Sequence, residues 1–141
     1  MIKMDTIDEL NENLVEFFDR FTAWENSVIQ QSSLTLAGAH AIEKLGQNGS
    51  MSMKELSKAL GVTTGTITVT VDRLEKGGYA LRDRSESDRR SYIIHLTEMG
   101  EKAFLDHHNH HLNLADEIAA SLTESEVKQL VRILGKINET I

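Results

Sequence analysis

Residues 61–96 constrain the fold of this chain more than any other stretch, because a helix, a stop and a strand pair follow one another directly. A Thr-rich helical segment opens after Gly61 and stops at Gly77-Gly78. Two short strand-like runs then flank a polar loop that ends in Asp88-Arg89-Arg90. A helix followed by a hairpin with an Arg-bearing tip is typical of a winged helix-turn-helix, which reads two adjacent DNA grooves. The stretch therefore predicts a DNA-binding regulator.

The rest of the chain is predicted to be helical. Apolar residues recur in steps of three and four from 7 to 28 and from 127 to 141, the pattern of two long packed helices. Shorter helices are expected over 35–45, 52–60 and 63–76, strands over 79–82 and 92–96, and a long helix from Thr97 to about residue 121. Ser52 and Thr123 each precede a Glu by three positions, as in a capping box.

These elements predict a mainly α-helical chain with a small β-hairpin wing, an α+β winged helix-turn-helix with dimerisation helices at both ends. Three parts are expected: an N-terminal dimerisation helix over 1–33, a DNA-binding domain over 34–96, and a long helix with a C-terminal dimerisation helix over 97–141. Symmetric dimers let DNA readers match two half-sites, so a homodimer on double-stranded DNA is expected.

Charge is distributed unevenly along the chain. The net charge is −7, yet residues 50–96 carry eight Lys/Arg against six Asp/Glu, which leaves −9 on the remainder. A polyanion would be attracted to residues 50–96 and repelled by the acidic remainder of the chain. The chain has no Cys, no apolar run long enough to cross a membrane and no signal-like start, so a cytoplasmic protein without a membrane partner is expected.

The second helix of the helix-turn-helix is expected to face DNA with its hydroxyl-bearing side. Ile67, Val71 and Leu74 are predicted core, which leaves five Thr side chains for other faces of a helix in which Thr is a mediocre former. Thr can bond phosphates or base edges and touch thymine methyls, and Gly65 allows a close backbone approach to a phosphate. The alternative is a helix that merely tolerates Thr. The predicted contacts are Thr63, Thr64, Gly65, Thr66, Thr68, Thr70 and Arg73.

The hairpin loop is predicted to supply the second set of DNA contacts, namely Arg84, Asp88, Arg89 and Arg90. Asp88 is expected to pin Arg90 in a bidentate pair while Arg89 enters the minor groove. A solvated charged loop is the alternative.

The segment 34–100 carries several short motifs, namely Leu34-Thr35, Leu56, Ala59-Leu60-Gly61-Val62, Thr66-Ile67-Thr68, Asp72-Arg73-Leu74-Glu75-Lys76-Gly77-Gly78-Tyr79, Asp88-Arg89-Arg90 and Leu96-Thr97-Glu98-Met99-Gly100. Together these motifs resemble the MarR family of winged-helix regulators. The resemblance implies a homodimer whose interface is built from the N- and C-terminal helices. Many family members carry Arg at the position of Val69, so one base or phosphate contact of the family is put in doubt here.

Within that family, residues 62–68 and 84–90 are most similar to the fatty-acid-synthesis repressors of Gram-positive bacteria, whose effector is an acyl chain on acyl carrier protein. The resemblance implies an acyl pocket with candidate lining residues Phe17, Phe18, Phe21, Trp24, His40 and Phe104. The alternative is that these aromatic residues are core and dimer seam.

A histidine cluster at 107–111 indicates a different effector. His107 and His111 lie one helical turn apart, a spacing that can chelate zinc or nickel, and His40 is the candidate third ligand. A zinc-sensing branch of the same family also has a His-rich run here and a His at the position of His40. Its Cys and Glu ligands have no counterpart at Val28 and Thr22, and Glu25 is out of step. A polar helix face without metal is the alternative.

An enzyme is not expected, because the chain has no Cys nucleophile, no Gly-x-Ser-x-Gly elbow and no His-Glu-x-x-His helix. The sequence thus predicts a homodimeric repressor that binds a pseudo-palindromic operator, with affinity set by a small molecule, an acyl carrier protein or a metal. The rival is an interaction or metal-buffering module on a winged-helix scaffold that does not bind DNA.

Overall fold

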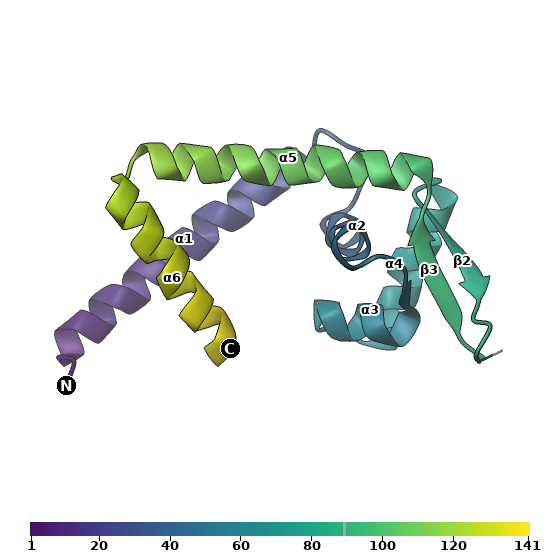
Figure 1. Cartoon of the computed structure of the whole chain (residues 1–141), viewed down its shortest axis with the longest axis horizontal. Coiled ribbons are helices and arrows are strands. Elements are labelled where there is room, and N and C mark those ends of the chain that lie inside the picture. The colour runs from purple at the N-terminus through teal and green to yellow at the C-terminus, as the bar shows by residue number, and fades with distance from the viewer. Residues whose placement is uncertain (89) are drawn as a thin grey trace. The chain divides into compact units, whose positions relative to one another are not determined.

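The computed structural model of the protein describes residues 1–88 and 90–141. The chain divides into two compact units, Met1–Phe104 and Leu105–Ile141, with the boundary inside one helix. The prediction of a mainly helical chain with a small hairpin wing is confirmed. The elements, in order, are α1 (Met4–Ile29), α2 (Leu36–Asn48), β1 (Met51–Ser52), α3 (Met53–Leu60), α4 (Thr64–Lys76), β2 (Ala80–Arg84), β3 (Tyr92–Leu96), α5 (Glu98–Ala120) and α6 (Glu124–Thr140) (Figure 1).

Local hydrogen bonds explain why most of these helices begin where they do. A hydroxyl accepts an amide N–H two or three residues into the helix, which satisfies one of its free donors. At α6 the capping box is complete, because the Glu126 carboxylate also accepts from the Thr123 amide at 2.9 Å. The capping hydroxyls belong to Thr35 for α2, Ser52 for α3, Thr63 for α4 and Thr123 for α6.

The sheet has three antiparallel strands in the order β1-β3-β2. The hairpin of β2 and β3 runs in register from Ala80 opposite Leu96 to Arg84 opposite Tyr92. The short strand β1, which the sequence did not predict, adds to the other edge with Met51 opposite Ile94. A strand of two residues is too short to show any alternation of apolar and polar side chains.

The core of residues 34–104 is closed within the first unit. Leu56, Ile67, Val71 and Ile94 are completely buried and come from α3, α4 and β3. Phe104 of α5 packs against this cluster and lies directly over Gly46 of α2, where an added Cβ would come within 2.3 Å of its ring. We call residues 34–104 the reading head. Its apolar side chains hold α2, α3, α4 and the hairpin together without help from another chain.

The start of α5 is tied to the end of α4. The Thr97 hydroxyl donates to the Gly78 carbonyl at 2.6 Å, and its amide donates to the Tyr79 carbonyl at 3.0 Å. A Cβ added to Gly100 would lie 2.0 Å from that same Tyr79 carbonyl oxygen. Only glycine therefore allows the first turn of α5 to approach the backbone that follows α4 so closely.

The terminal helices differ from the reading head in their exposure. α1 leaves a row of large apolar side chains at the surface, among them Leu10, Leu14, Phe17 and Phe18. None of the residues of α6 is buried, and Leu134 and Ile137 are 47% and 39% exposed. Among the described helices none combines the length and apolarity that crossing a membrane requires.

Candidate nucleic-acid interface

The turn between α3 and α4 is built by a left-handed glycine. Gly61 has φ +65°, and the amide of Val62 donates back to the Ser57 carbonyl at 3.0 Å, which ends α3. Three residues later α4 begins with Thr63 as its cap. The buried side chains of Ile67, Val71 and Leu74 then fix α4 against the core, as the sequence predicted.

The first turn of α4 is presented to solvent. Thr63, Thr64, Gly65 and Thr66 are all exposed. An added Cβ at Gly65 would meet nothing closer than the Thr63 hydroxyl at 3.9 Å, so the space in front of its backbone is open. Free amides at a helix start attract anions, and an open glycine lets a phosphate come close to them. The first turn of α4 is therefore open to solvent, and a phosphate contact there stays a prediction.

Hydroxyl groups along α4 bond to its own backbone and to one another. Thr63 caps the helix and donates to the Thr66 hydroxyl at 3.0 Å. The Thr68 hydroxyl donates to the Thr64 carbonyl at 2.7 Å. Because its hydrogen is used in this way, Thr68 offers solvent a methyl group and an acceptor oxygen. These bonds give Thr a structural reason to occur in α4, beside its predicted DNA contacts.

Thr70 is buried although the sequence predicted it as a DNA contact, whereas its neighbour Val69 is exposed. Thr70 is only 8% exposed, and its hydroxyl donates to the Thr66 carbonyl at 3.1 Å. So little of Thr70 reaches solvent that we leave it out of the interface. Val69, which stands where many MarR-family members carry Arg, is 52% exposed.

The wing loop is closed by short-range hydrogen bonds. The Ser85 amide donates to the Ser91 carbonyl at 3.0 Å, and the Ser91 amide donates to the Asp88 carbonyl at 3.1 Å. The carboxylate of Asp88 accepts the backbone amide of Arg90 at 3.0 Å. An Asp in a tight turn commonly bonds the amide two residues on in this way. The predicted bidentate pair of Asp88 with the Arg90 guanidinium stays a prediction. Arg89, the predicted minor-groove residue, lies outside the described residues.

An ion-pair cluster that the sequence did not reveal connects the wing with α4. Arg82 of β2 donates through Nε to the Glu75 carboxylate and through Nη2 to the Asp72 carboxylate. The hydrogen bond to Glu75 is the main cause that raises the pKa of the Arg82 guanidinium above its ordinary value, against the effect of burial. Asp72 and Glu75 are three residues apart on one face of a helix, and this spacing was the available signal.

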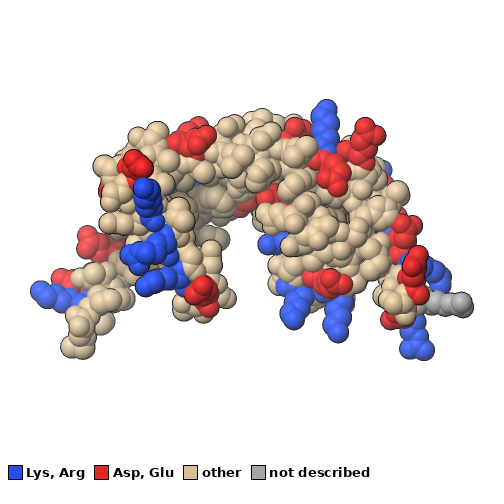
Figure 2. All heavy atoms as spheres, viewed as in Figure 1, with Lys and Arg blue, Asp and Glu red and all other residues tan. Residues whose placement is uncertain are grey.

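The distribution of charge agrees with an anionic ligand at the reading head. Lys54 and Lys58 extend from α3, Arg73 and Lys76 from α4, and Arg84 and Arg90 from the wing. Figure 2 shows Lys and Arg side chains below α3 and at the wing, with acidic side chains among them and over the start of α5. Basic groups on two neighbouring elements form the kind of electrostatic footprint that nucleic acid requires.

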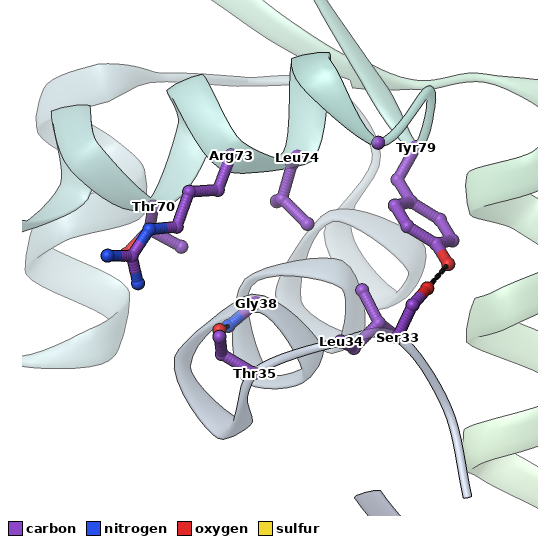
Figure 3. A pocket seen from close by; sticks show the side chains of 9 residues that line it. Ser33, Leu34, Thr35, Gly38, Thr70, Arg73, Leu74 and Tyr79 are labelled. Carbon is purple, nitrogen blue, oxygen red and sulfur yellow. Dashed lines mark hydrogen bonds between the residues drawn. The ribbon is translucent and has the colours of Figure 1, made fainter. Parts of the chain in front are cut away.

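A cavity of about 290 Å³ lies behind the C-terminal half of α4. The Ser33 and Tyr79 hydroxyls bond each other at 2.7 Å at one end, and Arg73 extends at the other (Figure 3). The residues predicted for an effector pocket do not line this cavity, so it is separate from the predicted pocket. Its lining consists of Ser33, Leu34, Thr35, Gly38, Thr70, Arg73, Leu74, Gly77 and Tyr79.

The predicted acyl-pocket residues have different environments. On α1 the Phe21 ring lies 6.0 Å from that of Phe17 and 5.6 Å from that of Trp24, while Phe17 itself is 56% exposed. Phe104 belongs to the core of the reading head. The lining of an acyl pocket by these side chains stays a prediction.

The candidate metal ligands form two pairs, one in each unit. In the first unit His40 Nε2 lies 2.9 Å from the Glu25 carboxylate, and the Glu25 side chain is 11% exposed. In the second unit the Nε2 atoms of His107 and His111 lie 3.1 Å apart. The sequence predicted the second pair from its spacing, but it did not predict Glu25 as the partner of His40.

Comparisons with known proteins agree with this geometry. The family model described as MarR family matches residues 34–92. The chain is 32% identical to the HTH-type transcriptional regulator BilQ of Clostridium symbiosum, over 88% of the chain and 86% of that protein. It is 32% identical to the HTH-type transcriptional regulator MgrA of Staphylococcus aureus, over 81% of the chain and 76% of that protein.

Solved structures extend the likeness over almost the whole chain. The crystal structure of Streptococcus pneumoniae FabT in complex with DNA superposes with a TM-score of 0.87 at 28% identity, covering 95% of this chain and 96% of that one. A MarR family protein from Bacillus stearothermophilus superposes with a TM-score of 0.88 at 23% identity, covering 99% and 98%, a likeness of fold.

Proposed function

The chain belongs to the MarR family of DNA-binding transcriptional regulators, and we propose that it acts as a homodimeric repressor of genes whose operators are pseudo-palindromic. The observation that carries this proposal is the exposed first turn of α4, from Thr63 to Thr66, beside a basic wing. The likeness to Streptococcus pneumoniae FabT, whose crystal structure is a complex with DNA, supports DNA binding.

In the proposed complex α4 enters the major groove and the wing enters the adjacent minor groove. The amides at Gly65 approach a phosphate, and the methyl groups of Thr64 and Thr68 reach thymine methyls. Arg84 and Arg89 supply positive charge to the minor groove. Arg89→Ala should therefore weaken DNA binding while the helical content and the dimer persist, and an unchanged affinity would contradict the wing assignment.

Salt dependence distinguishes this function from the rival interaction or metal-buffering module. Binding to a random-sequence duplex is measured by fluorescence anisotropy at several salt concentrations. If six or more phosphates are neutralised, the affinity falls about 10³-fold or more between about 50 and 200 mM salt. A protein that gives no anisotropy change at the lowest salt, or no slope, would favour the rival.

The dimer is proposed from the exposed apolar sides of α1 and α6. Leu10, Leu14 and Phe17 are exposed on α1, and Leu134 and Ile137 are exposed on α6. Large exposed apolar patches mark interaction sites, and a two-fold interface uses the same patch on both copies. An effector that changes the spacing of the two reading heads would then move them out of register with the half-sites.

For the effector we propose a divalent metal held by His107 and His111. Their Nε2 atoms are 3.1 Å apart, close to the roughly 3.3 Å that a tetrahedral ion with Zn–N bonds of about 2.0–2.1 Å requires. When bound, the ion would supply a fixed link between successive turns of α5. An acyl chain is the alternative effector.

Native mass spectrometry and zinc or nickel titration of the untagged protein test the effector. The wild-type dimer should bind metal. His107→Ala or His111→Ala should weaken metal binding at least about tenfold, because even the loss of a residue that only supports a metal ligand has about that effect. His110→Ala is the matched control on the same helix, and His40→Ala tests the predicted third ligand. A metal-free dimer with a fatty-acid-sized adduct would favour the acyl chain instead.

A further inference from the structure

The ion-pair cluster around Arg82 lies where the wing leaves the reading head. Along β2, Ala80 is completely buried and Arg82 comes two residues later, so both side chains point to the α4 side of the hairpin. Directly across the ladder, Arg82 pairs with Ile94, which is completely buried. The base of the wing is thus fixed in the core, and Arg82 is the next residue outward on the same face.

Arg82 contacts both of the elements that are proposed to reach DNA. On one side its guanidinium donates to Asp72 and Glu75 of α4. On the other side its Cζ lies 5.8 Å from the centroid of the Tyr92 ring in β3. Arg84 lies 5.9 Å from the same ring and stands opposite Tyr92 in the ladder. A continuous row of charged and aromatic groups therefore connects α4 with the stem of the wing.

The cluster is suited to fix the angle between the wing and α4, and it contributes little to the stability of the fold. The Arg82 side chain is 22% exposed, whereas those of Asp72 and Glu75 are 52% and 30% exposed. Ion pairs with this much solvent contribute little net stability. A guanidinium that bonds two carboxylates nevertheless has a defined orientation, which a Lys ammonium would not have.

Small changes of that angle are amplified at the tip of the wing. Asp88 lies six residues beyond Arg82, which is up to about 20 Å at roughly 3.3 Å per strand residue. A rotation of about 10° about the base of the hairpin would then move the tip by about 3 Å, enough to break a hydrogen bond to a groove.

We propose that Arg82 is a positioning residue that sets the angle between the wing and α4, and thereby the distance between the two groove contacts. This inference rests on the proposed DNA-binding function. Arg82 itself contacts α4 and Tyr92, and it acts on DNA through the wing.

The direction in which one substitution changes DNA affinity distinguishes a positioning role from an electrostatic effect on DNA. Glu75→Gln removes a negative charge close to the proposed interface, so on electrostatic grounds alone it would raise the affinity for a polyanion. If the carboxylate instead fixes Arg82, the same substitution lowers the affinity. Glu86→Gln removes an exposed carboxylate of the wing loop, outside the cluster, and is the matched control.

The test uses the full-length protein and a duplex that the wild type selects from a random library. We expect Arg82→Met to lower affinity about tenfold or more and Glu75→Gln to lower it in the same direction, while Glu86→Gln leaves it unchanged or raises it. Hydroxyl-radical protection should be lost beneath the wing and kept beneath α4. The paired exchange of Arg82→Glu with Glu75→Arg should recover part of the affinity and of the wing footprint.

Two other outcomes have separate meanings. If the wild type selects no duplex and shows no salt-dependent binding, the proposed function itself fails. If the wild type binds but Glu75→Gln binds more tightly with an unchanged footprint, the positioning role of Arg82 is overturned. Thermal unfolding of each variant identifies any that lose affinity through loss of fold, and Asp72→Asn then provides an independent measurement on the same cluster.

Discussion

The reading head and the terminal helices bury their apolar side chains in different ways. In the reading head, Leu56, Ile67 and Ile94 are completely buried within one chain. In α6 no residue is buried, and α1 exposes Phe17 and Phe18 by 56% and 67%. Helices of similar apolar periodicity thus end in opposite environments. Apolar periodicity predicts that one face of a helix will be buried. The structure shows whether residues of the same chain bury that face.

The largest effect is expected in the core of the reading head. Ile67→Ala should lower the free energy of unfolding by about 2–5 kcal/mol, because it leaves a cavity among fully buried neighbours. Val69→Ala, two residues along the same helix and 52% exposed, is the control and should change it by no more than about 0.5 kcal/mol. Urea unfolding measures both, and equal losses would show that the distinction between the two faces of α4 is wrong.

The next effect concerns the exposed face of α6. Leu134→Glu places a charge in the proposed dimer interface, so it should convert dimer to monomer. Loss of the second reading head should weaken operator binding about 100-fold or more. Sedimentation analysis and anisotropy measure the two effects, with Gln129→Glu as control on the same helix. A Leu134→Glu protein that remains a dimer would contradict the assignment of this face.

Substitution of one glycine in the reading head and one in α6 compares how closely the two regions are packed. Gly100→Ala should lower the free energy of unfolding by about 1–3 kcal/mol, because the new Cβ would lie 2.0 Å from the Tyr79 carbonyl oxygen. At Gly135 of α6 nothing lies within 4 Å of an added Cβ in the single chain. Gly135→Ala should therefore stabilise by about 0.5–1 kcal/mol through helix propensity. A loss at Gly135 would indicate that the partner chain packs closely there.

The smallest effect is a pH dependence of α6. Hydrogen bonding to the Thr123 amide lowers the pKa of the Glu126 carboxyl below its ordinary value. Because the folded pKa lies below the unfolded one, this cap stabilises α6 above the ordinary carboxyl range and is lost as the pH falls through the folded pKa. Circular dichroism of Glu126→Gln should show a smaller loss of helicity on acidification than the wild type, with Glu139→Gln as control. Equal curves would contradict the role of this cap.

Local signals made many of the helix boundaries predictable. Thr35, Ser52, Thr63 and Thr123 mark the starts of helices, and Gly61 marks an end, because caps depend on residues within one turn of the chain. The predicted strand at residues 92–96 agrees with β3. The first strand of the wing runs from Ala80 to Arg84, shifted relative to the predicted 79–82.

Contacts between distant residues were the part that the sequence did not reveal. The Arg82 cluster joins a strand to the preceding helix, and the pair of Glu25 with His40 joins residues 15 positions apart. The pair of Glu25 with His40 depends on no local pattern, and the spacing of Asp72 and Glu75 does not indicate which Arg they bind. The burial of Thr70 was also missed, because it was grouped with Thr64, Thr66 and Thr68 as a DNA-facing residue. Such contacts arise only when helices pack at a definite angle.

The most direct test of the account is selection of binding sites by the full-length protein from a random duplex library, followed by sequencing. If two reading heads are joined by the terminal helices, the enriched duplexes should contain an inverted repeat with half-site centres about 10–11 bp apart or a multiple of that. Enrichment of a single unrepeated motif, or no enrichment at all, would contradict a dimer that reads DNA through α4 and the wing.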